Sequence, residues 1–298
     1  MSKLPRIVIT GGTGFIGSSL IERLSRSGYS IVSLERSPAR SMKSVRRVAI
    51  DLTDYAALSR LIKKDDVVVH LACSSIPKTA EDHRADDVRE NLFPTLTLLD
   101  ACVKKGARKF LFASSGGMVY GGSYARPIRE SDPPEPMSSY GALKLSIENY
   151  LGVYVRRYQL PTVILRIANV YGRIGTKRPT RGAVEAFLYA ALHNEPAQRL
   201  GDPVRDYVHI DDVVSFIEQA VRSSRIEGVY NVGTGVGTSL TQLADIIRKV
   251  THRRLLLNAS AAPAADVPYA VVNIRKALAT GWKPTYTLQK GILALLEK

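Results

Sequence analysis

The sequence predicts an α/β fold built around a doubly wound parallel sheet, because apolar strand-like runs alternate with helical patterns along its first two thirds. The continuous β-branched run Val67-Val68-Val69 supports this fold, since strands buried on both faces of a parallel sheet are typically of this kind. The apolar run 7–10 is followed at once by a glycine-rich turn and a helical pattern. With 298 residues, the chain is long enough for such a core and a smaller lobe.

Strands and helices are expected in turn as far as residue 171. Each expected strand is a short apolar run, and the strands cover 7–10, 29–35, 45–51, 66–72, 109–115 and 162–167. The expected helices cover 15–26, 87–105 and 140–158. Pro94 lies near the start of the second helix and predicts a kink or a late start there. The Pro-rich segment 132–136 predicts a loop that ends just before the third helix.

After Tyr171 the pattern loosens, because proline and glycine interrupt shorter elements. We expect residues 1–171 and 205–254 to form the core that contains the sheet. Residues 172–204 and 255–298 are expected to form a smaller, discontinuous C-terminal lobe.

The composition is that of an ordinary globular protein, with 45% apolar and 23% charged residues. No apolar run reaches the length of roughly 18 residues that a membrane-spanning helix needs. The N-terminus enters the first strand almost at once, without the features of a secretory signal, so we expect a cytoplasmic protein. Cys73 and Cys102 lie in apolar stretches and are expected to be reduced, and the histidines show no metal-ligand spacing.

The chain carries a formal net charge of +15, which suits a polyanionic ligand such as a nucleotide diphosphate. Nucleic acid is the alternative ligand for a basic surface. The lysines and arginines are spread along the chain in twos and threes, with no basic tail or arm. This spread favours an ordinary solvated surface, and nucleic-acid binding is not favoured.

The first glycine-rich turn predicts a dinucleotide site of the Rossmann kind. Gly11, Gly14 and Gly17 allow a tight bend and a close approach of the backbone to a pyrophosphate, which would sit at the start of the helix beside Phe15 and Ile16. Glu35 ends the second strand and is placed to accept hydrogen bonds from the adenosine ribose hydroxyls.

A carboxylate at this position would repel a 2′-phosphate, so NAD is favoured over NADP. Arg36 and Arg40 keep NADP open, because either could pair with that phosphate. Asp51 and Leu52 end the third strand, where a carboxylate could meet the adenine amino group. The fourth strand ends at Leu71, Ala72 and Cys73, where small side chains would let the dinucleotide pass. The assignments at the third and fourth strands follow from the rule that ligands bind at the carboxyl ends of the strands in such sheets.

Tyr140 and Lys144 are four residues apart in the third helix and therefore lie on nearly the same face. A lysine ammonium beside a tyrosine favours the phenolate and lowers the tyrosine pKa. Such a phenolate can accept a proton from a substrate hydroxyl near neutral pH.

With these residues in place, the chain resembles the extended short-chain dehydrogenase/reductases, in the nucleotide-sugar epimerase/dehydratase group that includes UDP-glucose 4-epimerase. The resemblance covers essentially the whole chain. It rests on seven segments in the right order: 10–17, 70–72, Asn91, 114–121, 140–144, 165–172 and 205–212.

The resemblance implies a hydride-transfer mechanism. Tyr140 would remove the proton of a sugar C4 hydroxyl while the carbon gives hydride to NAD, and Lys144 would bind the nicotinamide ribose. The keto-sugar would then turn over, and hydride would return to its other face, which makes the enzyme an isomerase that retains its cofactor. Ala113 and Asn91 are implied as further cofactor contacts.

A serine or threonine at the end of the fifth strand completes the catalytic set of the family. Many members place it three residues before the Val of Val119-Tyr120-Gly121, where this chain has Gly116. A subgroup with a Gly-Gly pair has it one residue earlier, which indicates Ser115, with Ser114 as support for the strand. Ser75, Gly116 and Asn169 are implied as further substrate contacts.

Two other departures bear on the reaction. The dehydratases of the group carry an Asp-Glu pair beside the catalytic Ser or Thr, and the corresponding positions within 116–118 hold no acid, so dehydration is not favoured. Of the two arginines that usually bind the substrate diphosphate, Arg205 matches the first and Pro263 stands in place of the second. Either another cation such as Arg181 substitutes, or the substrate is not a common uridine diphosphate sugar.

We therefore expect an NAD-dependent nucleotide-sugar 4-epimerase whose smaller lobe binds the substrate. A nucleotide-sugar ketoreductase, with a dissociable and NADP-like cofactor, is the alternative enzyme. An RNA-binding relative of the same fold is a third possibility, which the presence of both Tyr140 and Lys144 disfavours. A homodimer is expected, because family dimers commonly pair the helices that here contain 96–99 and 147–154, although these faces could equally belong to the ordinary core.

Overall fold

The computed structural model describes residues 4–37, 45–75, 77–122, 124–173, 182–262 and 266–297. The chain forms two compact units. Unit 1 comprises Met1–Ser115, Ser138–Leu165 and Val214–Tyr230, and unit 2 comprises Gly116–Met137, Arg166–Val213 and Asn231–Lys298. None of the helices in the described segments combines the length and the apolarity needed to cross a lipid bilayer.

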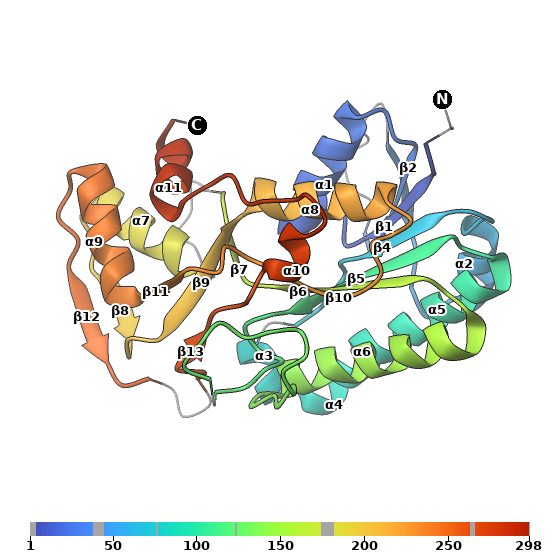
Figure 1. Ribbon diagram of the computed structural model, residues 1–298, viewed down its shortest axis with the longest axis horizontal. Coiled ribbons are helices and arrows are strands. Elements are labelled where there is room, and N and C mark those ends of the chain that lie inside the picture. Colours follow the sequence, from blue (N-terminus) through green and yellow to red (C-terminus); the bar gives the residue numbers. More distant parts are fainter. Residues whose placement is uncertain are drawn as a thin grey trace. The chain divides into compact units, whose positions relative to one another are not determined.

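Unit 1 is built on a seven-stranded sheet with the strand order β10-β6-β5-β4-β1-β2-β3 (Figure 1). These strands are β1 (Ile7–Thr10), β2 (Ile31–Glu35), β3 (Val45–Ala49), β4 (Val67–His70), β5 (Lys109–Ser115), β6 (Thr162–Ile167) and β10 (Gly228–Val232). β1 pairs in parallel with β2 and β4, and further parallel pairs join β2 to β3 and β4 to β5. The predicted doubly wound parallel sheet is confirmed, since the chain builds outward from β1 in both directions.

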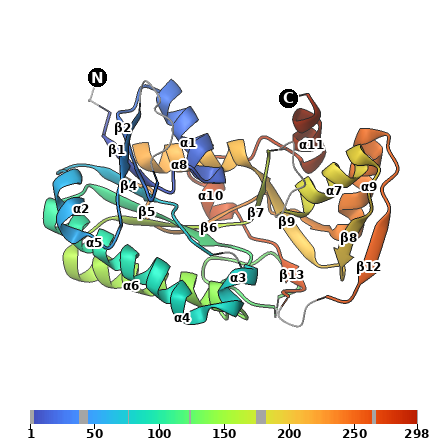
Figure 2. The same ribbon diagram turned by 180° about the vertical axis from the view of Figure 1, so that it is seen from behind.

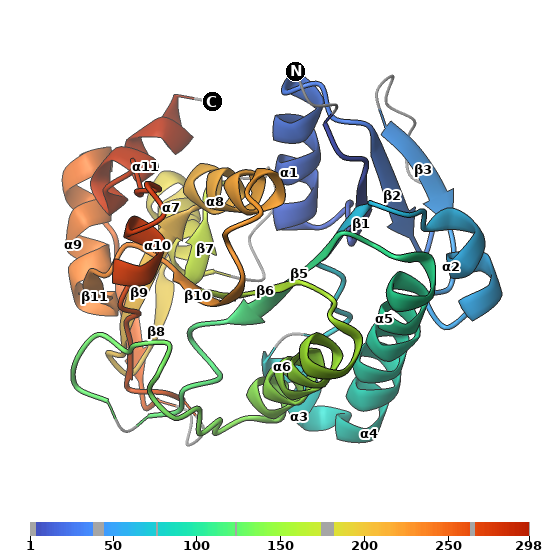
Figure 3. The ribbon, with the colours of Figure 1, turned by 45° about the vertical axis from the view of Figure 1, so that its right-hand side comes forward.

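Helices cover both faces of this sheet. α2 (Tyr55–Leu61), α5 (Phe93–Lys105) and α6 (Ser139–Tyr158) lie on one face, and α5 and α6 run side by side when seen from behind (Figure 2). α1 (Phe15–Arg26) and α8 (Ile210–Arg222) lie on the other face (Figure 3). Glu218 joins these two helices, because it accepts from Arg23 Nε at 2.5 Å and from Ser27 Oγ at 2.7 Å.

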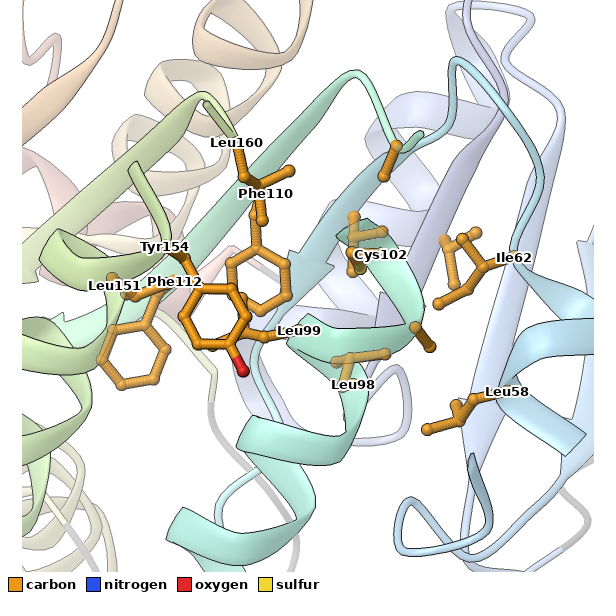
Figure 4. Packing of buried hydrophobic residues seen from close by; sticks show 14 of the residues in the cluster. Leu58, Ile62, Leu98, Leu99, Cys102, Phe110, Phe112, Leu151, Tyr154 and Leu160 are labelled. Atoms are coloured by element: carbon orange, nitrogen blue, oxygen red, sulfur yellow. The ribbon is translucent and has the colours of Figure 1, made fainter. Parts of the chain in front are cut away.

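The core between the sheet and the α5–α6 face is continuous and apolar (Figure 4). Phe110 and Phe112 project from β5, Leu98 and Leu99 from α5, and Leu151 from α6, and each is almost fully buried. Side chains two apart on a strand share a face, so Ser114 continues the Phe110–Phe112 row toward α6. The row therefore leads along β5 to the carboxyl edge of the sheet, where the candidate active site begins.

Regular α-helix starts late in the segment 87–105, which confirms the prediction made from Pro94. Two short helices, α3 (Pro77–Asp82) and α4 (Arg84–Asp87), precede a π-helical turn, η1 (Val88–Leu92), and α5 begins only after it. The proline lies in the first turn of α5, where its missing N–H is not needed. Asn91 lies within the π-helical turn.

Unit 2 contains two further sheets. One has the order β11-β9-β13, with β7 also paired to β9, and the other joins β12 to β8. The strands are β7 (Asn169–Tyr171), β8 (Ala197–Leu200), β9 (Val204–His209), β11 (Gly237–Ser239), β12 (Leu257–Ser260) and β13 (Tyr269–Ala270). The helices are α7 (Ala183–His193), α9 (Leu240–Thr251), α10 (Arg275–Leu278) and α11 (Leu288–Leu296).

The structural division of the chain differs from the division expected from its sequence pattern. Residues 116–137, 166–171, 205–213 and 231–254 belong to unit 2 and not to unit 1, and the last two residues of β6 and of β10 are among them. The reason is packing: α9 contributes Leu243 and Ile247 to an apolar core with Phe187 and Leu188 of α7 and Ile292 of α11. The spacing of apolar residues identifies such a helix but does not indicate which core receives it.

Candidate active site

The turn between β1 and α1 has a backbone shape that lets α1 pack closely on it and lets a ligand approach its backbone. Gly11 has φ +73°, a conformation that side chains disfavour. A Cβ on Gly17 would collide with the carbonyl oxygen of Gly11 and lie 2.8 Å from Gly12 Cα, so α1 can pack against the turn only with glycine there. α1 has neither a side-chain cap nor an acidic residue in its first turn, and Phe15 and Ile16 begin it. Its N-terminus therefore suits a pyrophosphate.

Glu35 at the end of β2 is buried and only half satisfied. Its Oε1 accepts from Ser33 Oγ at 2.8 Å and pairs with the Arg47 guanidinium. Its Oε2 is buried and has no hydrogen-bond partner among the described residues. Because an unsatisfied buried acceptor is costly, the missing donor fits a ribose hydroxyl. Glu35 therefore fits the adenosine end of an NAD molecule.

The sequence did not identify Arg47. β2 and β3 are parallel, and their register places Arg47 opposite Ser33 on the neighbouring strand. Only that non-local register brings the guanidinium to Glu35. Arg36, which the sequence offered as a phosphate ligand, is exposed, and Arg40 lies outside the described residues.

Asp51 and Leu52 follow β3. Asp51 is exposed and accepts a hydrogen bond from the Thr53 backbone N–H at 2.8 Å. That bond, together with one from the Thr53 side chain, lowers the pKa of Asp51. Asp51 is thus a fixed carboxylate at a strand end, and its contact with adenine stays a prediction.

A directed chain of hydrogen bonds positions the loop after β4. Thr95 Oγ1 donates to the Asn91 carbonyl at 2.6 Å, so it must accept from His70 Nε2 at 2.9 Å. His70 Nδ1 is then the acceptor for Thr10 Oγ1 at 2.7 Å, and Thr10 Oγ1 in turn accepts the Ala72 N–H at 3.2 Å. Neutral His70 thus joins β1, β4 and α5 to the loop 71–75.

Asn91 acts on the same loop. Its Oδ1 accepts the Ser74 N–H at 2.8 Å, and its Nδ2 donates to Ser74 Oγ at 2.9 Å and to Asp87 Oδ1 at 2.7 Å. The amide is fully used within the protein, so the structure supports a positioning role for Asn91. Leu71, Ala72, Cys73 and Ser75 of the loop are partly exposed, and a Cβ on Gly11 would lie 2.7 Å from Ala72 N. The loop therefore packs directly on the glycine turn.

The buried His70 predicts a pH-dependent stability. Burial and then the Lys144 charge lower the pKa of His70 to about 3, against roughly 6.5 in an unfolded chain. Between these values only the unfolded state binds the proton, so the free energy of unfolding falls as the pH drops from about 6.5 toward 3, by up to about 1.4 kcal/mol per pH unit. The measurement is denaturant unfolding at pH 6.5 and at pH 4.5. Between these pH values the free energy of unfolding should fall less in His70→Gln than in the parent.

His252→Gln is the control, because His252 is exposed, and its free energy of unfolding should fall as much as that of the parent. An equal fall in all three proteins would refute the assignment to His70.

Tyr140 and Lys144 meet in the first turns of α6, as the spacing predicts. Ser138 caps the helix by accepting the Gly141 N–H at 3.2 Å. Lys144 is buried, and its Nζ donates to the Ala113 carbonyl at 3.0 Å and lies 5.5 Å from the centre of the Tyr140 ring. Burial alone would lower the pKa of Lys144, but its electrostatic interactions, first with Tyr140 and then with Cys73, outweigh burial, so the pKa is raised. Lys144 is therefore a cation held beside a partly exposed tyrosine.

The end of β5 places Ser114 and Ser115 in different surroundings. Ser114 is buried, and its hydroxyl donates to the Glu148 carboxylate one helical turn beyond Lys144. Ser115 is the last residue of β5 and is partly exposed. The hydroxyl of Ser114 is already used, so Ser115 is the better candidate for a substrate contact. The Ala113 carbonyl holds Lys144 in place by accepting a hydrogen bond from its ammonium group.

Crowding explains why position 116 is glycine. A Cβ there would lie 2.8 Å from Val272 Cγ1 and 2.9 Å from the Arg166 carbonyl oxygen, and Gly116 N–H donates to the Ile167 carbonyl at 2.8 Å. A serine at this position would not fit. The serine is therefore displaced by one residue, to Ser115, in agreement with the alternative register.

The substrate-binding residues expected in unit 2 are only partly described. Asn169 is exposed at the start of β7. Arg205 is largely buried and pairs with Asp266, with Nη2 and Oδ1 2.5 Å apart. Arg181 and Pro263 lie outside the described residues. No group of three or more His, Cys, Asp or Glu in the described ranges could hold a metal ion.

Comparison with known proteins gives consistent matches. A family model described as the NAD dependent epimerase/dehydratase family matches residues 7–233. The UDP-glucose 4-epimerase of Mycolicibacterium smegmatis is 33% identical over 316 residues, covering 98% of this chain and 97% of that protein. The structure of Thermus thermophilus UDP-glucose 4-epimerase with NAD has a TM-score of 0.89 at 31% identity, covering 98% of both chains. That of the Thermotoga maritima UDP-glucose 4-epimerase with UDP-glucose has a TM-score of 0.90 at 31% identity, covering 98% of this chain and 97% of that one.

Proposed function

The chain belongs to the NAD-dependent epimerase/dehydratase family of extended short-chain dehydrogenases/reductases, and we propose that it inverts C4 of a nucleotide diphosphate sugar. Its cofactor is NAD. The observation that carries the proposal is the buried Lys144 ammonium, anchored to Ala113 and held beside Tyr140. This arrangement supports reversible deprotonation of a sugar hydroxyl.

Tyr140 takes the proton from the C4 hydroxyl and later returns it to the oxygen of the 4-keto intermediate. NAD, when bound, would supply reversible hydride acceptance at C4 of the sugar. Lys144 keeps Tyr140 in the ionised form by its charge, and it is suited to bind the nicotinamide ribose. Ser115 donates a hydrogen bond to the same sugar oxygen and so fixes its position.

Two observations separate this proposal from neighbouring reactions. Loss of water from the sugar needs an acid beside the catalytic serine, and residues 116–118 have no carboxyl group. Reduction with dissociable NADPH needs a site for a 2′-phosphate, and the buried Glu35 carboxylate opposes one. Inversion of C4 with a retained NAD is consistent with the lack of a carboxyl group at 116–118 and with the Glu35 carboxylate.

The proposed substrate class is a uridine diphosphate sugar, as in the UDP-glucose 4-epimerases that match over nearly the whole chain. Arg205 offers the diphosphate a guanidinium, and its pair with Asp266 orients that group. Asn169, Ser75 and Arg181 remain proposed contacts.

A homodimer and a cytoplasmic location are also proposed. Apolar side chains are exposed on α5 and α6, with Phe93 at 59%, Tyr150 at 43% and Val153 at 40%. Such a surface suits a second copy of the chain. Cys73 and Cys102 are free thiols, as is usual in a reducing compartment.

The test is a panel of uridine, guanosine and thymidine diphosphate sugars, each incubated with the purified protein without added cofactor. Proton NMR should show inversion at C4 for at least one uridine diphosphate sugar, with protein-bound NAD present by absorbance after denaturation. Protein that is purified empty and oxidises NADPH with a keto-sugar would overturn the proposal in favour of a reductase.

A further inference from the structure

Three polar residues lie next to the glycine turn at the adenosine end of the cofactor site: Ser33, Glu35 and Arg47. Ser33 and Glu35 share a face of β2, and Arg47 lies opposite Ser33 on β3. A Cβ on Gly12 would collide with Ser33 Oγ, so this cluster packs directly beneath the turn. The cluster thus lies where the fold places the adenosine ribose.

The cluster consists of a buried charge pair in which one acceptor and one donor make no hydrogen bond with the described residues. The side chains of Glu35 and Arg47 are 2% and 13% exposed. Ser33 Oγ and one terminal nitrogen of the Arg47 guanidinium meet Oε1 of Glu35. Two buried atoms, Glu35 Oε2 and Arg47 Nε, make no hydrogen bond with the described residues. A hydroxyl can donate to such an acceptor, whereas a dianionic phosphate has no proton to donate and would leave Glu35 Oε2 without a partner.

We propose that Arg47 is the group that would bind the 2′-phosphate of NADP in this chain, and that its ion pair with Glu35 withholds it. The pair, and not the charge of Glu35 alone, then sets the preference for NAD. A guanidinium is well suited to a phosphate, which offers it several acceptor oxygens. A 2′-phosphate can bind Arg47, however, only if the ion pair between Arg47 and Glu35 breaks. The buried Glu35 carboxylate would then have no counter-charge, which is strongly unfavourable.

The proposal makes Arg47 a latent phosphate ligand that one substitution releases. Glu35→Gln removes the charge of the competitor but keeps its size. The released guanidinium then accepts a 2′-phosphate. Arg36 is the rival cation, because it directly follows Glu35 and is exposed.

The experiment measures which nucleotide the whole protein retains. Each variant is incubated with equal concentrations of NAD and NADP and gel-filtered, and the nucleotides are released with acid and quantified by chromatography. The parent should retain mainly NAD. Glu35→Gln should shift the retained NADP:NAD ratio by roughly 10- to 100-fold toward NADP, the value of a charge-assisted phosphate contact. Glu35→Gln/Arg47→Met should lose that shift, whereas Glu35→Gln/Arg46→Met, altered at the neighbouring residue on β3, should keep it.

Two results would overturn the proposal: no shift in Glu35→Gln, or a shift that survives Arg47→Met but is lost with Arg36→Met. Folding is checked by the melting temperature, which NADP should raise in Glu35→Gln and not in the Arg47→Met double variant. Glu35→Ser replaces Glu35→Gln if the latter does not fold. Because the readout is binding, it is independent of whether the protein inverts sugars.

Discussion

Tyr140→Phe is expected to lower kcat by roughly 10²- to 10⁴-fold while leaving the fold and the bound NAD in place, because it removes the only proposed proton acceptor. Turnover is measured with the sugar nucleotide that the protein inverts, and cofactor content is measured on the same sample. Tyr158→Phe is the matched control, since Tyr158 ends the same helix with 47% of its surface exposed and should retain full activity. Activity of Tyr140→Phe within tenfold of the parent would exclude Tyr140 as the proton acceptor.

Gly17→Ala is expected to abolish NAD binding and to destabilise the protein. The new Cβ would be forced against the Gly11 carbonyl, which cannot move without disrupting the turn that we propose holds the pyrophosphate. Overpacking of this kind lowers the melting temperature by roughly 5–10 °C in a protein of this size. The measurements are the NAD content of the purified protein and its thermal unfolding.

Gly152→Ala is the control for this substitution. Gly152 is also helical, but the atoms nearest to an added Cβ belong to the flexible Arg156 side chain, the closest at 3.2 Å. This variant should keep its NAD and melt no lower than the parent, since alanine favours a helix. Normal NAD content in Gly17→Ala would show that the close approach of α1 to the turn is not required.

Local sequence patterns were sufficient for most of the seven-stranded sheet and for the two motifs of the site. Apolar runs identified six of its strands, all except β10, and 109–115 and 162–167 match β5 and β6 residue for residue. The spacing of Gly11, Gly14 and Gly17 identified the turn, and the four-residue spacing of Tyr140 and Lys144 identified the pair on α6. Each of these features depends on residues close together in the chain.

The features that sequence patterns did not identify depend on distant residues. Arg47 reaches Glu35 only through the register of two parallel strands. Gly116 is required by Val272 and the Arg166 carbonyl, and the hydroxyl of Ser114 is engaged by Glu148 on α6. The placement of 231–254 in unit 2 follows from helix packing that apolar spacing does not specify.

The most direct test of the account follows the hydrogen at C4 of the substrate. The sugar nucleotide that the protein inverts is prepared with deuterium at C4 and incubated in ordinary water with no added cofactor, and the product is analysed by NMR and mass spectrometry. Hydride transfer to and from a retained NAD predicts inversion with the deuterium still at C4. Exchange of that deuterium for solvent hydrogen, or inversion only when nucleotide is added, would contradict the account.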